Sequence, residues 1–390
     1  MRRVQQSELA LDKPLPWPLY DEHGNLLLRA GYVISIPRHL DSLLKRGAYI
    51  QTAGPQRLPL FESSISAHED AQFAFRATSL PTSQPVFTRA EALAQSLKRL
   101  HTHLQAQSLQ VELRTIVRSL ANALMQACTE DADALLAAFH LDRQSPYLVI
   151  QQLLGCTLTE VAAREMGLDA ETRLSLACAG LTRDIALLPW QAQLDMQIHE
   201  LDAQQNALIR VHPLRSAEIL AAHGVDDPLW LELVRQHHER IDGSGYPHAL
   251  QGAAILPGAR LLGIADSYSA MVTPRPNRQG KIPKDALKSL YLQRACLYDE
   301  DLLRVSVGAL TTLPPGTIVR LANDELAVIR IRQKKDTPAA LWALYDKNGM
   351  PIMNPKPRDA TDPAHAITHV LRVEECRSAA LVMKRLWTHI

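Results

Sequence analysis

Cysteines are few in this sequence and form no recognisable pair. The five that occur are widely scattered, and no CxxC motif joins any two of them: Cys128, Cys156, Cys178, Cys296 and Cys376. An odd and scattered set argues against a disulfide framework and against a thiolate zinc site. We therefore expect a cytoplasmic protein, because a reducing compartment keeps such thiols free.

Long hydrophobic runs and a surplus of charge of either sign are also missing. No stretch reaches about 18 uncharged apolar residues, and the N-terminal stretch has no apolar core of signal-peptide length. Lys and Arg number 42 against 41 Asp and Glu, which gives a formal net charge of +1. This balance gives no electrostatic reason to expect a nucleic-acid partner or a polybasic membrane contact. We expect neither secretion nor membrane spanning.

The pattern of apolar residues divides the 390 residues into five segments. With 46% hydrophobic residues, the chain can bury more than one core. We predict a small strand-rich N-terminal domain of α+β or β type at 1–60, a linker at 61–88, a helical connector at 89–130, an all-helical domain at 131–300 and a small β-rich C-terminal domain at 301–390. The predicted fold class is mainly α.

Short strand patterns support the two terminal domains. In the first, WPLY, NLLL and YVISI are strand-like pieces around glycines, and IPRHLDSLLKRG is typical of one short helix that ends at Gly47. In the last, two β-branched stretches flank an Asn-Asp turn, and LWALYDKNGMPIM predicts a hairpin around Asn348 and Gly349. A helix from Glu374 to Trp387 is expected to close the chain.

The connector carries an apolar stripe at helical spacing. The stripe is made of Ala90, Leu93, Leu97, Leu100 and Leu104 and continues through Leu113, Ile116, Val117, Leu120 and Leu124. We expect that these helices could pair across a homodimer.

Ionisable residues stand on apolar faces of the helices predicted at 131–300. Asp184 continues the inward stripe of a helix that runs from about 171 to 188. His237 and His238 each follow an apolar residue by four positions, so the pair extends the apolar face of one helix up to a glycine-rich loop. Two adjacent imidazoles are therefore expected to reach the interior together.

Two further residues complete the candidate set. Asp266 stands where the helical period predicts an apolar residue, and His212 precedes Pro213, which suits the first turn of a helix that ends at Gly224. Buried ionisable groups are costly unless they are paired, hydrogen-bonded or metal-bound, and three His with two Asp are a typical metal-binding set. Zinc, iron or manganese would be chemically reasonable.

Each of these residues also has a purely structural explanation. His212 alone is more often a helix cap or a satisfied core histidine, and Asp184 alone is more often part of a salt bridge, since Arg183 is adjacent. His237 and His238, directly before DGSGYP, are harder to explain by packing. We therefore give the histidine pair the most weight.

The stretch HHERIDGSGYP resembles the HHExxDGxGYP signature of the HD-GYP family. HPLRSAEIL is similar to the family's HPxxGxxIL helix and supplies His212. ARLLGIADSYSAMVTPRPNR is similar to its ARILxIADxYDAxxxxRPYR stretch and supplies Asp266 and Arg275. The resemblance extends from near 145 to about 298.

The resemblance implies an all-helical phosphodiesterase domain with a metal centre. In the family, two or three metal ions activate water for attack on a phosphate of cyclic-di-GMP, which opens the ring to pGpG or GMP. The implied metal ligands are Asp184, His212, His237, His238 and Asp266, of which Asp184 and Asp266 would be the catalytic carboxylates. The residues that would contact the nucleotide are Gly245, Tyr246 and Arg275.

The chain departs from the family at the first metal position. Arg183 stands where the family has the histidine of its His-Asp pair, Gln151 replaces an upstream histidine, and Ser269 and Asn277 replace an aspartate and a tyrosine. A guanidinium cannot coordinate a metal, so Arg183 should repel a cation and offer its donor fork to a ligand phosphate or to Asp184. We therefore expect one divalent ion, of iron, manganese or zinc, rather than two or three.

Three functions follow from this comparison. The favoured one is a degenerate HD-GYP protein of bacterial cyclic-di-GMP signalling, which binds the nucleotide or protein partners and hydrolyses the nucleotide weakly or not at all. The alternative is an active metal-dependent phosphodiesterase that produces pGpG or GMP. A helical hydrolase that acts on another phosphoester is the third.

Overall fold

The computed structural model divides into two compact units, Met1–Ile65 and Ser66–Ile390. It describes residues 84–376, except 110, 198, 277, 334–336, 351 and 353, and also residues 386 and 387. In the N-terminal unit it describes residues 1–4, 8, 9, 19, 20, 22, 26–28, 49 and 50.

Short strands make up most of the described part of the N-terminal unit. They are β1 (Arg2–Arg3), β2 (Leu19–Tyr20), β3 (Leu26–Leu28) and β4 (Tyr49–Ile50). They form an antiparallel sheet in the order β1-β4-β2-β3. The strands predicted at WPLY and NLLL are confirmed. The strand predicted at YVISI and the helix predicted up to Gly47 lie outside the described residues.

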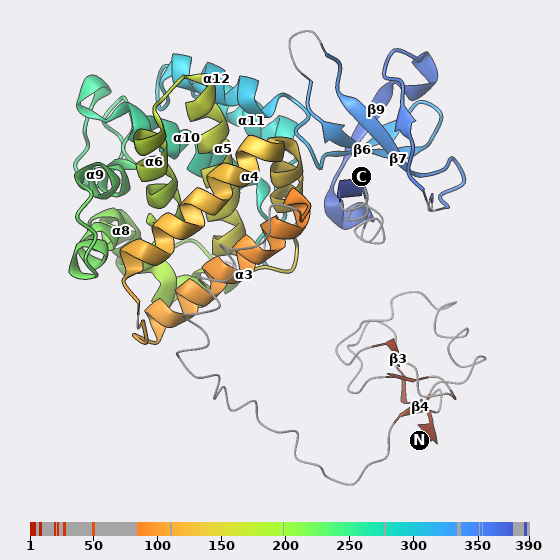
Figure 1. Cartoon of the computed structure of the whole chain (residues 1–390), viewed down its shortest axis with the longest axis horizontal. Coiled ribbons are helices and arrows are strands. Elements are labelled where there is room, and N and C mark those ends of the chain that lie inside the picture. Colours follow the sequence, from red (N-terminus) through yellow and green to blue (C-terminus); the bar gives the residue numbers. More distant parts are fainter. Residues whose placement is uncertain are drawn as a thin grey trace. The chain divides into compact units, whose positions relative to one another are not determined.

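A helical body begins the second unit (Figure 1). Its first part contains α3 (Val86–Gln105), α4 (Leu113–Leu141), α5 (Tyr147–Glu165), α6 (Ala170–Thr182), the 3₁₀ helix η2 (Ile185–Trp190) and α7 (Gln191–Met196). Its second part contains α8 (Ala203–Ala222), α9 (Pro228–Gln236), η3 (Gly252–Ala254), α10 (Pro257–Val272), α11 (Pro283–Leu292) and α12 (Glu300–Leu310). The prediction of a mainly α fold is confirmed. Within the described parts of the chain, we find no helix with both the length and the apolarity that crossing a bilayer requires.

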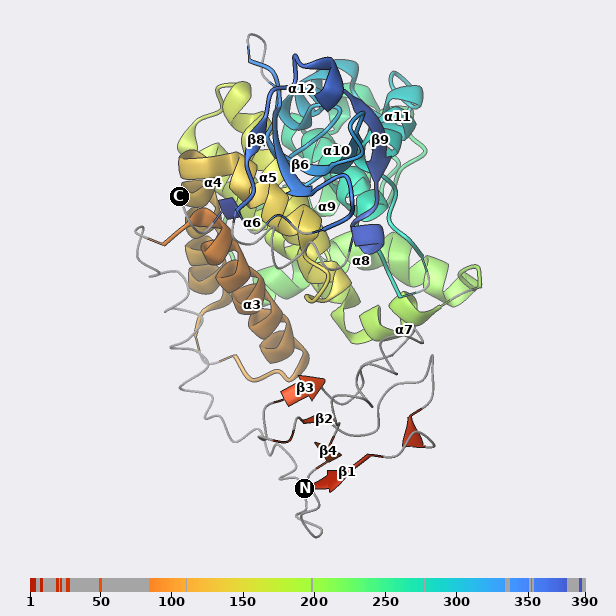
Figure 2. The same ribbon diagram turned by 90° about the vertical axis from the view of Figure 1, so that its right-hand side faces the viewer.

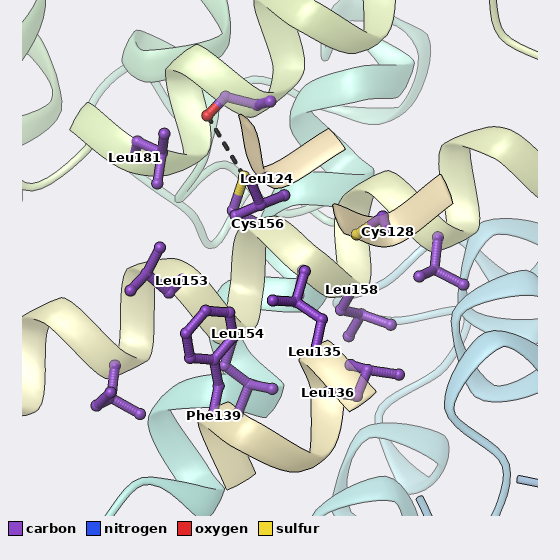
Figure 3. Close-up of a cluster of buried hydrophobic side chains, with 14 of the residues drawn as sticks. Leu124, Cys128, Leu135, Leu136, Phe139, Leu153, Leu154, Cys156, Leu158 and Leu181 are labelled. Carbon is purple, nitrogen blue, oxygen red and sulfur yellow. Dashed lines mark hydrogen bonds between the residues drawn. The ribbon is translucent and has the colours of Figure 1, made fainter. Parts of the chain in front are cut away.

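Helix α5 lies at the centre of this body. It is buried along almost its whole length and packs against α4, α6, α10 and α12. A helix without a distinct polar face is typical of such a position. Figure 3 shows part of this core, where Cys156 of α5 donates a long hydrogen bond of 3.5 Å to the carbonyl of Ala177. Burial raises the pKa of the Cys156 thiol, so this cysteine behaves as a core residue.

Helices α3 and α4 lie side by side in the helical body and pack against α5 (Figures 1 and 2). Their apolar stripe faces inward, and Leu93, Leu97, Leu120 and Leu124 are at most 3% exposed. The stripe is therefore covered by the chain's own core, to which α5 and α6 contribute. A homodimer stays a prediction, but this stripe is not available to build it.

A five-stranded antiparallel sheet follows α12, in the order β8-β7-β6-β5-β9. Its strands are β5 (Ile318–Leu321), β6 (Leu326–Ile331), β7 (Ala340–Tyr345), β8 (Pro357–Arg358) and β9 (Ile367–Leu371). The predicted Asn-Asp turn joins β5 to β6, where Asp324 has a φ of 68°. The predicted turn at Asn348 and Gly349 also forms, because the Gly349 amide donates to the Asp346 carbonyl at 2.9 Å.

Buried charges join this sheet to the helical body. Arg332, just after β6, places its Nε 3.1 Å from Asp133 Oδ1 of α4 and donates its backbone N–H to Asp133 Oδ2 at 3.2 Å. After β9 the chain forms the short 3₁₀ helix η5 (Val373–Cys376). Most of the rest of the helix predicted up to Trp387 lies outside the described residues.

Candidate metal centre

Asp184 lies at a break between two helices. Helix α6 ends at Thr182, and Asp184 has φ and ψ of −108° and 13° before η2 begins. The continuous helix predicted from about 171 to 188 is therefore wrong. Successive side chains on an α-helix point roughly 100° apart, and the break allows Arg183 and Asp184 both to stay in the interior.

His212 lies in the middle of α8. This helix begins after its capping residue Asp202, so the helix start predicted beside Pro213 is wrong. Pro213 has no N–H, and the Ile209 carbonyl therefore loses its usual helical partner four residues later. His212 Nδ1 donates to that carbonyl at 2.6 Å. The freed carbonyl thus orients the imidazole, with Nε2 on the side of Asp184.

His237 and His238 follow the last turn of α9. The Trp230 indole N–H of this helix donates to the Thr182 hydroxyl at 2.9 Å, which ties α9 to the end of α6. His237 Nδ1 donates at 2.6 Å to the carbonyl of Val234, one of those that a helix C-terminus leaves free. The His237 and His238 ring centroids are 4.1 Å apart. Both imidazoles reach the interior, as predicted, although the His238 side chain stays 17% exposed.

Asp184, His212, His237 and His238 come together in one cluster. One candidate ligand atom from each lies within 4.8 Å of the others. Asp184 Oδ1 is 3.3 Å from His212 Nε2 and 3.9 Å from His237 Nε2. The two Nε2 atoms are 3.3 Å apart. One carboxylate and three imidazoles can therefore hold a divalent ion such as zinc, iron or manganese.

The ring nitrogens that face one another carry lone pairs. A carbonyl oxygen only accepts hydrogen bonds, so His212 and His237 hold their protons on Nδ1 and keep Nε2 for coordination. Burial is the main cause that lowers the pKa of His237 to about 3. Burial also lowers the pKa of His238. Neutral imidazoles with lone pairs this close repel one another unless a cation lies between them, so the residues fit a metal ion.

Asp184 is the anionic member of the cluster. Burial alone would raise its pKa, but the charge of Arg183 is the largest of the effects that lower the pKa below its usual value. Arg183 Nε is 3.3 Å from Asp184 Oδ2, the oxygen turned away from the histidines. Asp184 therefore offers a full negative charge to an ion on its Oδ1 side.

Arg183 and Asp266 form the other side of the site. Arg183 Nε donates to Asp266 Oδ1 at 3.1 Å, and its Nη2 is 3.0 Å from the same oxygen. Gln151 Nε2 also donates to this oxygen. Asp266 Oδ2 is 3.8 Å from His238 Nδ1. Asp266 is thus outside the four-residue cluster, and its metal and catalytic roles stay predictions. The donor fork of Arg183 contacts the carboxylates of Asp184 and Asp266.

The acidic residues of HHERIDGSGYP hold its loop. Glu239 is buried, and its two carboxylate oxygens accept the backbone N–H groups of His248 at 2.7 Å and Leu250 at 3.0 Å. Asp242 accepts from the backbone amide and the hydroxyl of Ser244, at 2.9 and 2.7 Å. These carboxylates therefore shape the backbone that follows the two histidines.

Gly245 and Tyr246 lie against the histidines. A Cβ on Gly245 would come within 2.6 Å of the His238 carbonyl oxygen, so a glycine is required for this approach. The Tyr246 and His238 ring centroids are 4.7 Å apart, and Arg210 Cζ lies 5.3 Å from the Tyr246 ring. His238 and Tyr246 are partly exposed, so the cluster opens to solvent on their side.

Arg275 is engaged elsewhere. Its Cζ lies 4.3 Å from the centroid of the Tyr147 ring, and its Nη2 donates to the Tyr147 hydroxyl at 2.8 Å. The nucleotide contact predicted for Arg275 therefore stays a prediction. Ser269 Oγ donates to the carbonyl of Asp266 at 3.0 Å, and Asn277 lies outside the described residues.

Near Asp184 lie two buried polar residues that were not predicted from the sequence. Gln152 Nε2 donates to Asp184 Oδ2 at 3.5 Å, and the buried His101 of α3 lies beside Gln152. A signal for His101 exists, because it follows the buried Leu97 by four positions, the spacing that identified the other histidines.

Known proteins share both the sequence and the fold of this region. Residues 134–302 match the family model described as an HD domain. The chain is similar to the cyclic di-GMP phosphodiesterase PA4108 of Pseudomonas aeruginosa, at 27% identity over 210 residues, which are 54% of this chain and 50% of that protein. It is similar to the 3'3'-cGAMP-specific phosphodiesterase 1 of Vibrio cholerae, at 32% identity over 145 residues, 37% of this chain and 33% of that protein. Among solved structures, Bd1817, a HDG"Y"P protein from Bdellovibrio bacteriovorus, superposes with a TM-score of 0.51 at 18% identity, covering 78% of this chain and 97% of that chain.

Residues 134–302 are an HD domain, and the resemblance of HHERIDGSGYP to the HD-GYP signature is confirmed. The likeness to Bd1817, at 18% identity, supports the fold alone. The chain spans 50% of the length of the first relative and 33% of the second. The activities in their names are properties of those proteins.

Proposed function

We propose that this HD-GYP domain binds a cyclic dinucleotide of the cyclic-di-GMP class at a single divalent ion and hydrolyses it weakly or not at all. The observation that carries the proposal is the cluster of Asp184, His212, His237 and His238 beside the buried Arg183. In this proposal the protein is a cytoplasmic regulator that passes the bound state to protein partners.

The donor set supports binding of an anionic ligand. A divalent ion held by the cluster would polarise a phosphate oxygen and lower the pKa of bound water toward roughly 7. Asp184 would supply a carboxylate oxygen to that ion, while Tyr246 lies beside the partly exposed His238 and Arg210 lies over the Tyr246 ring. An aromatic ring and a guanidinium can contact a nucleobase and a phosphate, respectively. We propose Gly245 and Arg275 as further contributors to the nucleotide site.

The other side of the centre supports weak hydrolysis. A two-metal mechanism needs both ions to stabilise the attacking and the leaving oxygens. Asp266 would be the carboxylate for a second ion, but its Oδ1 accepts hydrogen bonds from Arg183 and Gln151. A site with one ion would hold a phosphate more readily than it would cleave one.

Calorimetric titration of the full chain, loaded with Mn²⁺, with cyclic-di-GMP tests the proposal. We expect saturable binding that disappears when the ion is removed with a chelator. The 3'3'-cGAMP and linear pGpG nucleotides serve as comparison ligands for the cyclic-dinucleotide class. A chain that holds one ion and yet binds none of these at high micromolar concentration would overturn the proposal.

An active phosphodiesterase is the second candidate function, because every fixed position of HHExxDGxGYP is matched in HHERIDGSGYP. Metal-loaded protein would then convert cyclic-di-GMP or 3'3'-cGAMP to linear products, measured by chromatography. Turnover that is lost in His237→Ala would select this function over binding alone. Turnover that persists in His237→Ala would indicate a contaminating enzyme.

A further inference from the structure

Two carboxylates reach from the histidines to Arg183. Asp184 turns Oδ1 to His212 Nε2 at 3.3 Å and Oδ2 to Arg183 Nε at 3.3 Å. Asp266 turns Oδ2 to His238 Nδ1 at 3.8 Å and Oδ1 to Arg183 Nη2 at 3.0 Å. Each carboxylate therefore lies between an imidazole and the guanidinium, in the way that a carboxylate bridges two cations in a dinuclear centre.

The guanidinium is seated as a fixed part of the core. Its Nη1 donates to the Gly180 carbonyl, its other nitrogens contact the two carboxylates, and the side chain is 0% exposed. A Cβ on Gly155 of α5 would lie 3.5 Å from Arg183 Nη2 and 3.1 Å from Ser269 Oγ. The first distance is an ordinary van der Waals contact, so α5 packs directly beside the guanidinium. Arg183 is held away from solvent and does not extend toward a ligand.

The charges on this side suit one added ion and disfavour a second. Arg183 stays protonated at any physiological pH, and it neutralises one of the two carboxylates of Asp184 and Asp266. One net negative charge is left to face the neutral imidazoles. A second divalent ion between the same carboxylates would lie against a fixed positive charge in a buried site, where like charges repel strongly.

We propose that the Arg183 guanidinium is the resident second cation of this centre. It fills the space that a second metal ion would take between Asp184 and Asp266 and holds both carboxylates in position for the single ion. It cannot activate water, because a guanidinium has no coordination site. The inference rests on the proposed function, since it assumes that the four-residue cluster binds an ion. It adds that Arg183 keeps the number of bound ions at one.

Counting bound ions tests this inference without any assay of activity. The full chain is stripped with a chelator and saturated with Mn²⁺, and bound manganese is measured by elemental analysis and electron paramagnetic resonance. We expect one ion per wild-type chain, with the spectrum of isolated Mn²⁺. Arg183→His replaces the guanidinium with a ligand, and we expect two ions per chain with the spectrum of an exchange-coupled pair.

The matched control is Arg173→His, which changes another arginine paired with a buried carboxylate, that of Glu160. It should stay at one ion. Two ions in the wild type, or one ion in an Arg183→His chain with native circular dichroism, would overturn the inference and leave the proposed nucleotide binding intact. No ion in the wild type would remove both.

A second variant covers the case in which Arg183→His does not fold. Gln151→His with Arg183→His adds another imidazole at the residue that now contacts Asp266, so the carboxylate keeps a partner. Two ions in this folded double variant support the inference. A single ion in it contradicts the inference.

Discussion

The two sides of this centre satisfy their buried polar groups in opposite ways. On the histidine side, His212 and His237 turn Nε2 lone pairs toward each other at 3.3 Å beside Asp184. On the arginine side, a guanidinium that belongs to the chain lies between Asp184 and Asp266. Buried polar groups need partners. In the proposed function the first side takes up a divalent ion from solution, whereas the second already contains a cation, Arg183. The two sides therefore show two ways in which buried carboxylates can be neutralised.

The largest expected effect on metal binding is on the histidine side. His237→Ala removes a candidate ligand, and we expect Mn²⁺ binding to weaken by at least about 100-fold, since even changes beyond the ligands cost about 10- to 100-fold. Calorimetric titration with Mn²⁺ measures the change. His223→Ala is the control, because His223 Nδ1 makes the same kind of bond to a helix carbonyl, that of Ile219 at 2.8 Å, on an exposed surface. Equal Mn²⁺ affinity in the two variants would contradict the cluster.

The second effect separates the two sides. Asp266→Asn leaves the buried Arg183 with Asp184 as its remaining carboxylate, and we expect the free energy of unfolding to fall by about 3 to 5 kcal/mol. The ion count should stay at one. Urea unfolding and elemental analysis measure both quantities. Loss of the ion in a folded Asp266→Asn chain would make Asp266 a ligand and would end the distinction between the sides.

A surface ion pair provides the control for this change. Asp301 lies 2.8 Å from Arg304, with side chains 85% and 71% exposed. Such exposed pairs contribute little to stability. Asp301→Asn should therefore unfold at nearly the same urea concentration as the wild type.

His140 is a buried histidine of another kind, because in its described contacts it pairs with neither a carboxylate nor the metal cluster. His140 Nε2 hydrogen-bonds to the Tyr268 hydroxyl at 2.8 Å. Burial, together with the charge of Arg143, lowers the pKa of His140 from 6.5 to about 4. A histidine with a lowered folded pKa stabilises the fold above pH 6.5, and that contribution is lost as the pH falls toward 4. The shift corresponds to about 3 kcal/mol.

Urea unfolding between pH 7 and 4 measures this contribution. The free energy of unfolding should fall with acid in the wild type and fall less steeply in His140→Gln, which does not titrate. Saturating Mn²⁺ should leave the difference between the two chains unchanged, because His140 is outside the cluster. Parallel curves for the two chains would mean that His140 contributes nothing to acid sensitivity.

The smallest expected effect concerns the orientation of the His212 imidazole. Pro213→Ala supplies an N–H that competes with His212 Nδ1 for the Ile209 carbonyl. We expect Mn²⁺ binding to weaken by about 10-fold, the lower end for changes that act through a ligand's orientation. Pro228→Ala, at the start of α9, is the control, because the first N–H groups of a helix have no helical partner. Unchanged affinity in Pro213→Ala would show that the proline does not orient His212.

Helical periodicity predicted which side chains converge, but it could not predict how they are aimed. The spacing from Leu233 to His237 places an imidazole on the inner face, and that part of the prediction is confirmed. The break at Asp184 is a change in backbone torsion, and the orientation of His212 depends on a single hydrogen bond. Neither feature has a period in the sequence. The partner of Arg183 lies 83 positions away at Asp266, a distance over which no local rule operates.

The missed residues have a different cause. His101 lies in the segment predicted as a connector, and its helical spacing was interpreted only as an apolar stripe. In the folded chain α3 packs on α4 and α5, so this histidine lies beside Gln152, which donates to Asp184. Packing between segments decides such contacts, and a single sequence carries no direct record of it.

The bonds that Glu239 makes to the backbone change what the family signature reports. Glu239 and Asp242 stabilise the turn that carries Tyr246 by accepting hydrogen bonds from the backbone. A protein that hydrolyses its ligand and one that only binds it both need this turn. A match to the signature at these positions therefore indicates that the loop has the family's structure. The capacity for hydrolysis has to be judged at Arg183 and the carboxylates around it.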